Sequence, residues 1–262
     1  MTPRLARLTI YPIKSLDGVD LDAGDILPSG ALRDDRRYAI ADPAGQFFHG
    51  KRDARIHRLA ATFDLVRREV TLAVRDAGSA GATFHLDDDR PRLDAWLSEH
   101  FGTKLHIVED SERGMPDDTQ APGPTIVSTA TLATVAEWFS PTTVDDARRR
   151  FRANLEIDGV PAFWEDRLVP GENGTVRLAV GEVVFEGTGV CQRCVVPSRH
   201  PETGDVIAGF AKEFSRQRQE SLPDWAPRWA FDHYYRLTIN TRLAPVSGGG
   251  RLRLGDELRL LN

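Results

Sequence analysis

Residues 189–205 read GVCQRCVVPSRHPETGD and contain both cysteines of this 262-residue chain. A Cys-X-X-Cys pair can be half of a structural zinc site, a disulfide redox centre, two inert buried thiols, or the source of one thiolate ligand for a soft metal. Each reading makes a different demand on the rest of the chain. The surrounding sequence therefore decides what the pair does.

The first two readings lack the residues they need. A structural zinc site takes four protein ligands, and this chain has no second cysteine pair and no spaced histidine pair after Cys194; adding His200 still leaves one ligand missing. A thioredoxin-like centre begins a helix at the pair, whereas Val195–Arg199 contains a proline and does not favour one. Inert thiols and a single thiolate whose metal is completed by a cofactor remain open, with Arg193 supplying a positive charge between the cysteines.

The composition indicates a globular protein with a sizeable core, 40% hydrophobic and 28% charged, with a formal net charge of −5. This balance argues against a nucleic-acid partner, despite one basic stretch at 148–152. No apolar run approaches the roughly 20 residues that span a bilayer, and residues 1–15 are too interrupted for a signal peptide. Two cysteines exclude a disulfide scaffold. We expect a cytoplasmic protein without a nucleic-acid or membrane partner.

Short strands dominate the predicted secondary structure. A polar stretch over 111–124, rich in proline and glycine, separates two parts. The first part predicts a strand over 5–11, hairpins over 37–49 and 60–74, a helix over 91–102 and a strand over 104–108. The second predicts strands over 125–127, 150–157, 176–179, 182–186 and 233–261 and helices over 128–139 and 208–220.

These elements show no internal repeat and no βαβ periodicity. They predict a mainly β chain with a few helices, of the α+β class, built as two β-barrel-like parts. We place the boundaries at residues 1–112 for the first domain, 113–124 for the linker and 125–262 for the second domain.

Five motifs along the chain resemble those of one family. Near the N-terminus, YPIKSLDGV at 11–19 and DRRY at 35–38 are similar to the opening of the MOSC N-terminal β-barrel domain. Further on, FRANL at 151–155, the Cys-X-Arg-Cys pair followed by PETG at 201–204, and LGDEL at 254–258 are similar to motifs of the MOSC domain. The chain thus resembles the MOSC molybdenum cofactor proteins, which include the mitochondrial amidoxime reducing component.

The resemblance implies a molybdenum–molybdopterin cofactor, whose metal is held by a pterin dithiolene, two oxo groups and one protein cysteine. The family ligand is the second cysteine of the pair, so Cys194 is the implied metal ligand and catalytic residue, and Cys191 is a packing neighbour. The implied activity is reduction of small N-hydroxylated compounds, such as amidoximes and hydroxylamines. The alternative is a molybdenum cofactor or sulfur carrier that uses Cys194 without turnover. A plain binding protein with inert cysteines is the third possibility, and pyridoxal phosphate is not expected.

The resemblance also implies a set of cofactor contacts. A cation and a hydroxyl at a strand end suit a phosphate, and arginines grip phosphate or pterin oxygens in a bidentate fashion that lysine does not. Two residues apart on the predicted strand, Arg152 and Asn154 would face the same way. Without the resemblance, surface ion pairs would explain Lys14, Arg36 and Arg152. The implied cofactor-binding residues are Lys14, Ser15, Arg36, Arg152, Asn154, Arg193 and Tyr234.

Arg199-His200 is the departure from the family, which often has Val-Asp there. This loop places two cationic or titratable groups near Cys194, and the hypothesis is that it favours a more anionic substrate or a different electron donor. Asp17 or His200 are candidates for proton delivery. The sequence ends at a GDELRLL segment, where some bacterial relatives continue into a ferredoxin domain, and two cysteines are too few for an iron–sulfur cluster. We therefore expect electrons from a separate cytochrome b5-, ferredoxin- or flavin-reductase-like protein.

Overall fold

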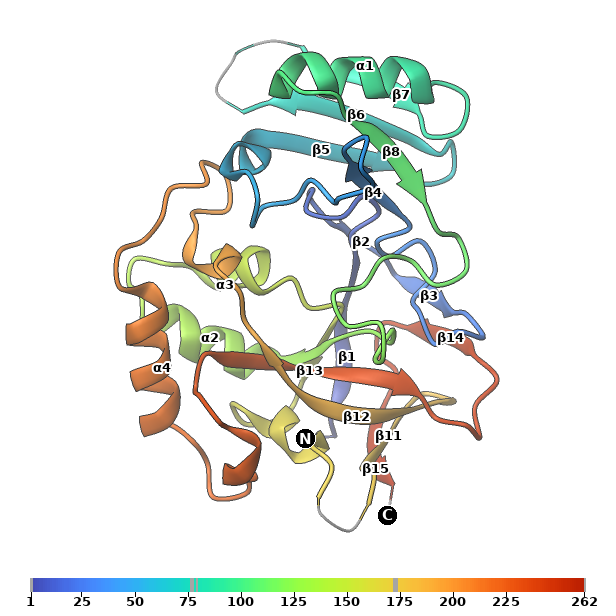
Figure 1. The fold of residues 1–262 in the computed structure, drawn as a ribbon. Coiled ribbons are helices and arrows are strands. Elements are labelled where there is room, and N and C mark those ends of the chain that lie inside the picture. The colour runs from blue at the N-terminus through green and yellow to red at the C-terminus, as the bar shows by residue number, and fades with distance from the viewer. Residues whose placement is uncertain (1, 76–77, 79, 172–173, 262) are drawn as a thin grey trace.

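The computed structural model describes residues 2–75, 78, 80–171 and 174–261 (Figure 1). Strands outnumber helices, which confirms the mainly β, α+β class. The described strands are β1 Arg4–Ile10, β2 Val19–Asp20, β3 Ala23–Ile26, β4 Tyr38–Ala41, β5 Leu59–Asp64, β6 Glu69–Val74, β7 Ala82–His85, β8 His106–Glu109, β9 Ile126–Ser128, β10 Leu155–Asp158, β11 Arg177–Val180, β12 Val183–Gln192, β13 Arg236–Leu243, β14 Gly250–Arg253 and β15 Leu258–Leu261. The described helices are α1 Arg90–Phe101, α2 Thr129–Glu137, α3 Val144–Phe151 and α4 Phe210–Glu220, with short 3-10 turns η1 Ala54–Arg58, η2 Trp164–Leu168, η3 Val196–Ser198 and η4 Arg228–Ala230.

The largest sheet draws on both ends of the chain. Its strand order is β15-β11-β12-β13-β9-β10-β1-β2, so the N-terminal β1 lies beside strands from far along the sequence (Figure 1). In the β1–β10 pair Leu8 faces Leu155, and β3 pairs separately with β14. The remaining described strands form a β5-β6-β7 sheet, which α1 covers, and a β4-β8 pair.

Three hydrophobic cores follow from this arrangement, and the third packs Leu132 of α2, Phe151 of α3 and Phe214 of α4 together. The first combines Leu5, Leu8 and Ile10 of β1 with residues between 126 and 258. The second is built from residues between 13 and 107, including Leu93 and Leu97 of α1. The first residues of the chain therefore belong to the core of its later part.

The prediction of a strand over residues 150–157 is wrong in its first half. Thr143 caps α3 in a capping box with Asp146, and acidic residues in the first turn and arginines in the last turn suit the helix dipole. The helix ends at Arg152, which adopts a left-handed backbone conformation with φ of 52°. Within the predicted range, only the residues that belong to β10 form a strand.

Because α3 was predicted as a strand, a crossover connection between two parallel strands was also missed. Strands β9 and β10 pair in parallel, and the chain passes from one to the other through α2 and α3. One βα-type crossover is thus present, although the sequence predicted none. Three helices, α2, α3 and α4, lie on one side of the large sheet (left in Figure 1).

Other predicted elements lie close to their expected positions. Ser128 caps α2 by accepting a hydrogen bond from the Thr131 amide at 3.1 Å, and Gly102 ends α1 with φ of 67°. The turn after β4 closes with a 3.0 Å bond from the Asp42 amide to the Gln46 oxygen, but the predicted hairpin is reduced to one bridge, because β4 pairs with β8 instead. In the described part of the chain, no helix is long and apolar enough to cross a membrane.

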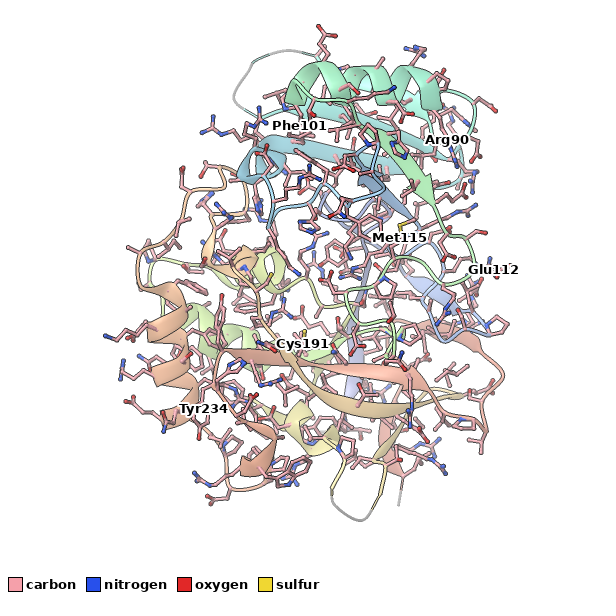
Figure 2. The ribbon with its side chains drawn as sticks, in the orientation of Figure 1. Arg90, Phe101, Glu112, Met115, Cys191 and Tyr234 are labelled. Carbon is pink, nitrogen blue, oxygen red and sulfur yellow. The ribbon has the colours of Figure 1, made fainter. Side chains whose placement is uncertain are left out.

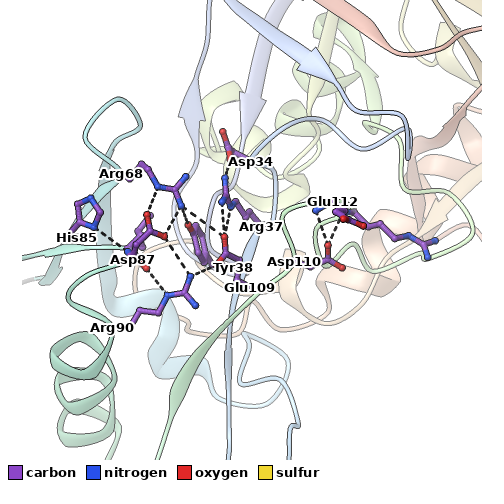
Figure 3. A network of polar contacts seen from close by, with 12 residues as sticks. Asp34, Arg37, Tyr38, Arg68, His85, Asp87, Arg90, Glu109, Asp110 and Glu112 are labelled. Carbon is purple, nitrogen blue, oxygen red and sulfur yellow. Dashed lines mark hydrogen bonds and ion pairs between the residues drawn. The ribbon is translucent and has the colours of Figure 1, made fainter.

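A charge network ties the second core together (Figure 3). Arg37 contacts Asp34 and Glu109, and Arg68 contacts Asp87 and the Tyr38 hydroxyl; Arg90 also pairs with Glu109. Each of these arginines has a carboxylate partner, which holds the pKa of Glu109 below its ordinary value despite burial. The network is structural.

Candidate functional site

A cavity of about 790 Å³ lies where the parts of the chain meet. Its walls come from residues 7–75 in the first part, from the segment 116–123, and from residues 125–201 with Asn240 in the second part. Among the described residues that line it are eleven lysines and arginines and six carboxylates. That surplus of positive charge, in a chain of net charge −5, suits an anionic ligand.

Both cysteines line this cavity. The long β12 carries two register irregularities, between Gly187 and Gly189 and between Val190 and Gln192, and Cys191 lies in the second of them. Cys194 follows the end of β12, and both are free, half-buried thiols. Figure 2 shows Cys191 near the middle of the molecule. The strand end therefore delivers two thiols to one cavity wall.

Arg193 is fixed between the two cysteines. Its amide donates to the Tyr235 oxygen at 3.0 Å, and its Nη2 donates to the Phe151 oxygen at 2.8 Å. Its Nη1 lies 3.3 Å from the Cys191 sulfur. The guanidinium is thus oriented by the end of α3 and contacts the neighbouring thiol of the pair.

Arg152 lies half-buried at the start of the loop after α3, with its Nη2 fully covered. Its guanidinium carbon lies 3.9 Å from the centre of the Tyr11 ring, and the Arg36 guanidinium lies 5.2 Å from the same ring. Burial, followed by the charge of Arg36, lowers the pKa of Arg152, but an arginine stays protonated at neutral pH. Arg36 pairs with Asp35.

Lys14 and Ser15 reach the cavity from the segment after β1. Lys14 is 8% exposed and donates to Asp117 Oδ1 at 2.7 Å and to the Met115 oxygen at 2.8 Å. Because the Asp117 side chain is 70% exposed, an anionic ligand can compete for this lysine. Ser15 has a left-handed backbone with φ of 74°, and its hydroxyl accepts from the Gly50 amide at 3.4 Å.

Asn154 lines the cavity but uses its amide within the fold. Its Oδ1 accepts from the Thr125 amide at 3.1 Å, and its Nδ2 donates to the Thr9 oxygen at 3.0 Å. It does not share a strand face with Arg152, because Arg152 is the left-handed end of a helix. The argument from strand geometry is therefore wrong, and the contact of Asn154 with a cofactor stays a prediction.

Tyr234 is the predicted site residue that the described cavity lining does not include. Its ring stacks on Phe231 with centroids 5.8 Å apart, toward the edge of the molecule in Figure 2. The next residue, Tyr235, is nearer to the thiols, since Cys194 raises and Arg193 lowers its pKa after burial has raised it. The cavity thus brings together Cys194 and the other six predicted residues without Tyr234.

The two residues proposed for proton delivery have structural contacts. Asp17 lines the cavity, accepts from the Ala61 amide at 2.9 Å and pairs with Arg75 at 2.5 Å. His200 is not in the described lining, and its Nδ1 faces the amides of the turn that follows it, at 3.3 and 3.4 Å. Neither arrangement supports proton delivery.

Four arginines distinguish the cavity from the network of Figure 3. Within the described part of the chain they have no carboxylate within ion-pair distance, and each has a buried guanidinium nitrogen without a hydrogen-bond partner. Buried polar groups without partners are rare in folded proteins, and buried charges are normally paired. The cavity is therefore built to receive negative charge. These residues are Arg150, Arg152, Arg193 and Arg199.

Sequence reasoning missed three residues of this site. His57 lines the cavity from η1, and burial together with the charges of Arg152 and Arg199 lowers its pKa to about 4. Arg150 donates to the Pro197 and Arg199 oxygens at 2.9 and 2.5 Å. Asp117 pairs with Lys14. Recognising the capping box of α3 would have placed Arg150 on a helix rather than on a strand. No local sequence pattern marks His57 or Asp117.

The chain matches the models of two protein families along nearly its whole length. The MOSC N-terminal beta barrel domain family matches residues 2–141, and the MOSC domain family matches residues 124–259. The chain belongs to this molybdenum cofactor-related family, and the expected β-barrel-like N-terminal domain is confirmed at the level of the family. The boundaries at 112 and 125 stay a prediction.

Curated relatives are molybdenum cofactor sulfurases. The chain is 24% identical over 235 residues to that of Drosophila mojavensis, covering 78% of this chain and 29% of the relative. It is 20% identical over 266 residues to the human protein, covering 83% and 29%, and 26% identical over 295 residues to that of Drosophila grimshawi, covering 100% and 35%. The chain thus spans about a third of the length of these relatives.

The residues present fit an anionic, metal-bearing cofactor. The orphaned guanidinium nitrogens match phosphate or other oxyanions, and a thiol beside them suits a soft metal. Among the residues that the structure describes, no group of three or more His, Cys, Asp or Glu side chains is placed to hold a metal ion. A single cysteine with a cofactor completing the ligand set is the arrangement that these side chains offer.

Proposed function

We propose that the chain binds a molybdenum–molybdopterin cofactor and reduces small N-hydroxylated compounds. The observation that carries this proposal is the position of Cys194 in a cavity whose four unpaired arginines call for an anion. The molybdenum cofactor, when bound, supplies the two-electron chemistry of oxygen removal from nitrogen. The membership of the MOSC family and the names of the relatives support the choice of cofactor.

The chain's own residues divide the work of binding. Cys194 is the metal ligand, and Arg193, held by the Phe151 oxygen, places a positive charge between the two cysteines. Arg152 and Arg36 hold oxyanions, and Lys14 exchanges its exposed partner Asp117 for a phosphate. Cys191 contacts Arg193 and orients it.

Electrons come from a separate donor protein of the cytochrome b5, ferredoxin or flavin-reductase kind, because two cysteines are too few to hold an iron–sulfur cluster. We place the protein in the cytoplasm on composition and cysteine usage. Neither nucleic acid nor a membrane is part of the proposal.

A second candidate is a cofactor or sulfur carrier. The relatives are named sulfurases, and a carrier would use Cys194 to hold the cofactor or a persulfide without turnover. It needs the same cationic cavity but no electron donor. The two candidates therefore differ in turnover and in the need for an electron donor.

The first prediction separates these functions. Protein from a host that makes the molybdenum cofactor is assayed for molybdenum, for pterin and for benzamidoxime reduction with an artificial electron donor. We expect Cys194→Ala to lose most of its molybdenum and to lower turnover by at least about 100-fold, because even outer-shell partners of a metal ligand contribute 10- to 100-fold.

Cys191→Ala is the matched control, since it removes the other thiol of the pair and leaves the proposed ligand in place. We expect it to retain the metal. Metal and pterin without reduction of benzamidoxime would support the carrier. Metal content that is equal in wild type and Cys194→Ala would overturn Cys194 as the metal ligand, both in the reductase and in the cofactor carrier.

A further inference from the structure

Arg199 is one of the four arginines without a carboxylate partner among the described residues, and the proposed cofactor contacts do not include it. Of the four, Arg152 and Arg193 belong to the proposed cofactor set. Arg150 donates to two main-chain oxygens, those of Pro197 and Arg199. Arg199 lines the same cavity as Cys194, and its Nε is buried without an acceptor in the described part of the chain.

The position of Arg199 is fixed by its main chain. Its amide donates to the Val196 oxygen at 3.0 Å at the end of η3, its carbonyl accepts from Arg150, and it forms a bridge with Val206. Its Nη1 donates to the Gly204 oxygen at 3.1 Å. A side chain anchored in this way presents a charge at a set place, which is what specific binding requires.

A second cavity residue, His57, adds no positive charge to this wall. His57 comes from η1 in the first part of the chain and lines the cavity, and its Nε2 is buried with no partner among the described residues. Burial and the nearby Arg152 and Arg199 charges lower the pKa of His57 to about 4, so the imidazole is uncharged at neutral pH. A weaker opposing influence on this pKa is a hydrogen bond to the backbone of Pro201, so the single N–H of the neutral ring is engaged there and the contact with an anion falls to Arg199.

We propose that Arg199 forms a subsite that binds a carboxylate of the substrate, so that the protein prefers N-hydroxylated compounds with an anionic group. The inference rests on the proposed function for the identity of the reacting group. The subsite itself rests on the cavity, the anchored guanidinium and the unpartnered Nε of Arg199. A charge-assisted contact of this kind discriminates strongly, because the unbound groups are buried.

The test begins with binding to the wild-type protein isolated from a cofactor-producing host. Terephthalamate and terephthalamide have the same shape, and only the first carries a carboxylate; neither has an N–O bond to reduce. Calorimetric titration is expected to give at least about tenfold tighter binding of terephthalamate, and the preference should shrink at high salt. Equal affinities would overturn the subsite without any variant having to fold.

Three variants locate the effect. Arg199→Gln removes the charge and keeps a donor for Gly204, and it should reduce the affinity ratio to about one; Arg199→Lys should restore part of it. Arg58→Gln is the matched control, because Arg58 contacts the Thr203 oxygen of the same turn at 3.4 Å but does not line the cavity. It should keep the wild-type ratio. The proposal would be overturned if the affinity ratio stayed at the wild-type value in Arg199→Gln, or if it fell equally in Arg58→Gln.

Turnover distinguishes this proposal from the one on which it rests. The same variants are assayed with benzamidoxime and 4-carboxybenzamidoxime, and the subsite predicts that Arg199→Gln lowers the preference for the anionic compound. Selective terephthalamate binding without turnover of either amidoxime would support the subsite and overturn the reductase. Turnover with no selectivity in binding or rate would do the reverse.

Discussion

Buried charge without a partner is the residue-scale feature on which the site depends. Arg152 illustrates it, because its buried Nη2 has no partner among the described residues and its guanidinium lies over the Tyr11 ring, near the positively charged Arg36. A buried unpaired charge destabilises a fold, so an anion that binds there stabilises the folded chain through mass action. The cofactor-free protein is thus expected to be less stable than the loaded one.

Glu165 is a second buried charge, and it gives a prediction at the same scale. Its side chain is 1% exposed, neither carboxyl oxygen has a hydrogen-bond partner among the described residues, and burial with the neighbouring Asp166 raises its pKa from 4.5 to about 7. Because the folded pKa is above the unfolded one, the fold favours the protonated form. Stability present below about pH 4.5 is lost as the pH rises toward 7.

Glu165→Gln should remove this loss. We compare the free energy of unfolding of the variant with that of wild type at two pH values. Between pH 4.5 and pH 8 this difference should shift in favour of the variant by an amount on the order of 3 kcal/mol. Urea unfolding across this range measures the free energy of unfolding of both proteins. Glu182→Gln, at an exposed turn, is the control. A difference between wild type and Glu165→Gln that does not vary with pH would show that Glu165 is not protonated in the fold.

At the scale of elements, the turn at Pro201–Gly204 sets where Arg199 stands. Gly204 has a φ of 77°, and a Cβ atom there would collide with the Ala54 carbonyl oxygen of η1. Gly209 has nearly the same φ, 75°, but no atom lies within 4 Å of a Cβ at that position. Comparing alanine substitutions at the two glycines therefore separates two losses of stability, one from the left-handed backbone and one from the steric contact.

Gly209→Ala should lower the free energy of unfolding by about 1 to 2 kcal/mol, the usual cost of a left-handed backbone for a residue with a side chain. Gly204→Ala should cost more than this and should also weaken binding of terephthalamate, because the turn carries the oxygen that anchors Arg199. Urea denaturation and calorimetry measure the two effects. Equal losses of stability would mean that η1 moves freely away from the turn.

Elements with a regular pattern and clear end signals could be predicted from the sequence. Helix α1, between a proline and Gly102, is an example. Helix α3 was not recognised, because it has few apolar residues beside its run of arginines and its clearest signal is the capping box at Thr143. The parallel pairing of β9 and β10 is a long-range contact that no local pattern encodes.

The site divides in the same way. Cys194, Arg152 and Arg193 stand in local motifs, and the structure brings them to one cavity. His57 reaches that cavity through the packing of η1 against the turn at 201–204, which depends on contacts between residues far apart in the sequence. A single sequence identifies motif residues well, and it does not show which distant residues complete the cavity.

For the whole molecule, the first and second hydrophobic cores do not divide the chain in sequence order. Strand β1 and residues Ile26 and Leu32 belong to the core that contains β9 to β15, whereas residues between 13 and 107 build the second core. The cavity lies where both units contribute walls. A defect in β1 should therefore act on the part of the chain that carries Cys194, more than 180 residues away in sequence.

Leu8→Ala and Leu97→Ala test this division, since both leucines are 0% exposed and lie in different cores. Each substitution should cost about 2 to 5 kcal/mol of stability. Hydrogen exchange measured by segment should quicken in β9, β10 and β13 for Leu8→Ala, because β1 pairs with β10 and packs against this sheet. For Leu97→Ala the increase should fall in β5, β6 and β8 instead. Because the cysteine pair follows β12, molybdenum content should fall further in Leu8→Ala than in Leu97→Ala. Faster exchange confined to residues 2–112 in the Leu8→Ala protein would show that the first part of the chain is an independent unit after all.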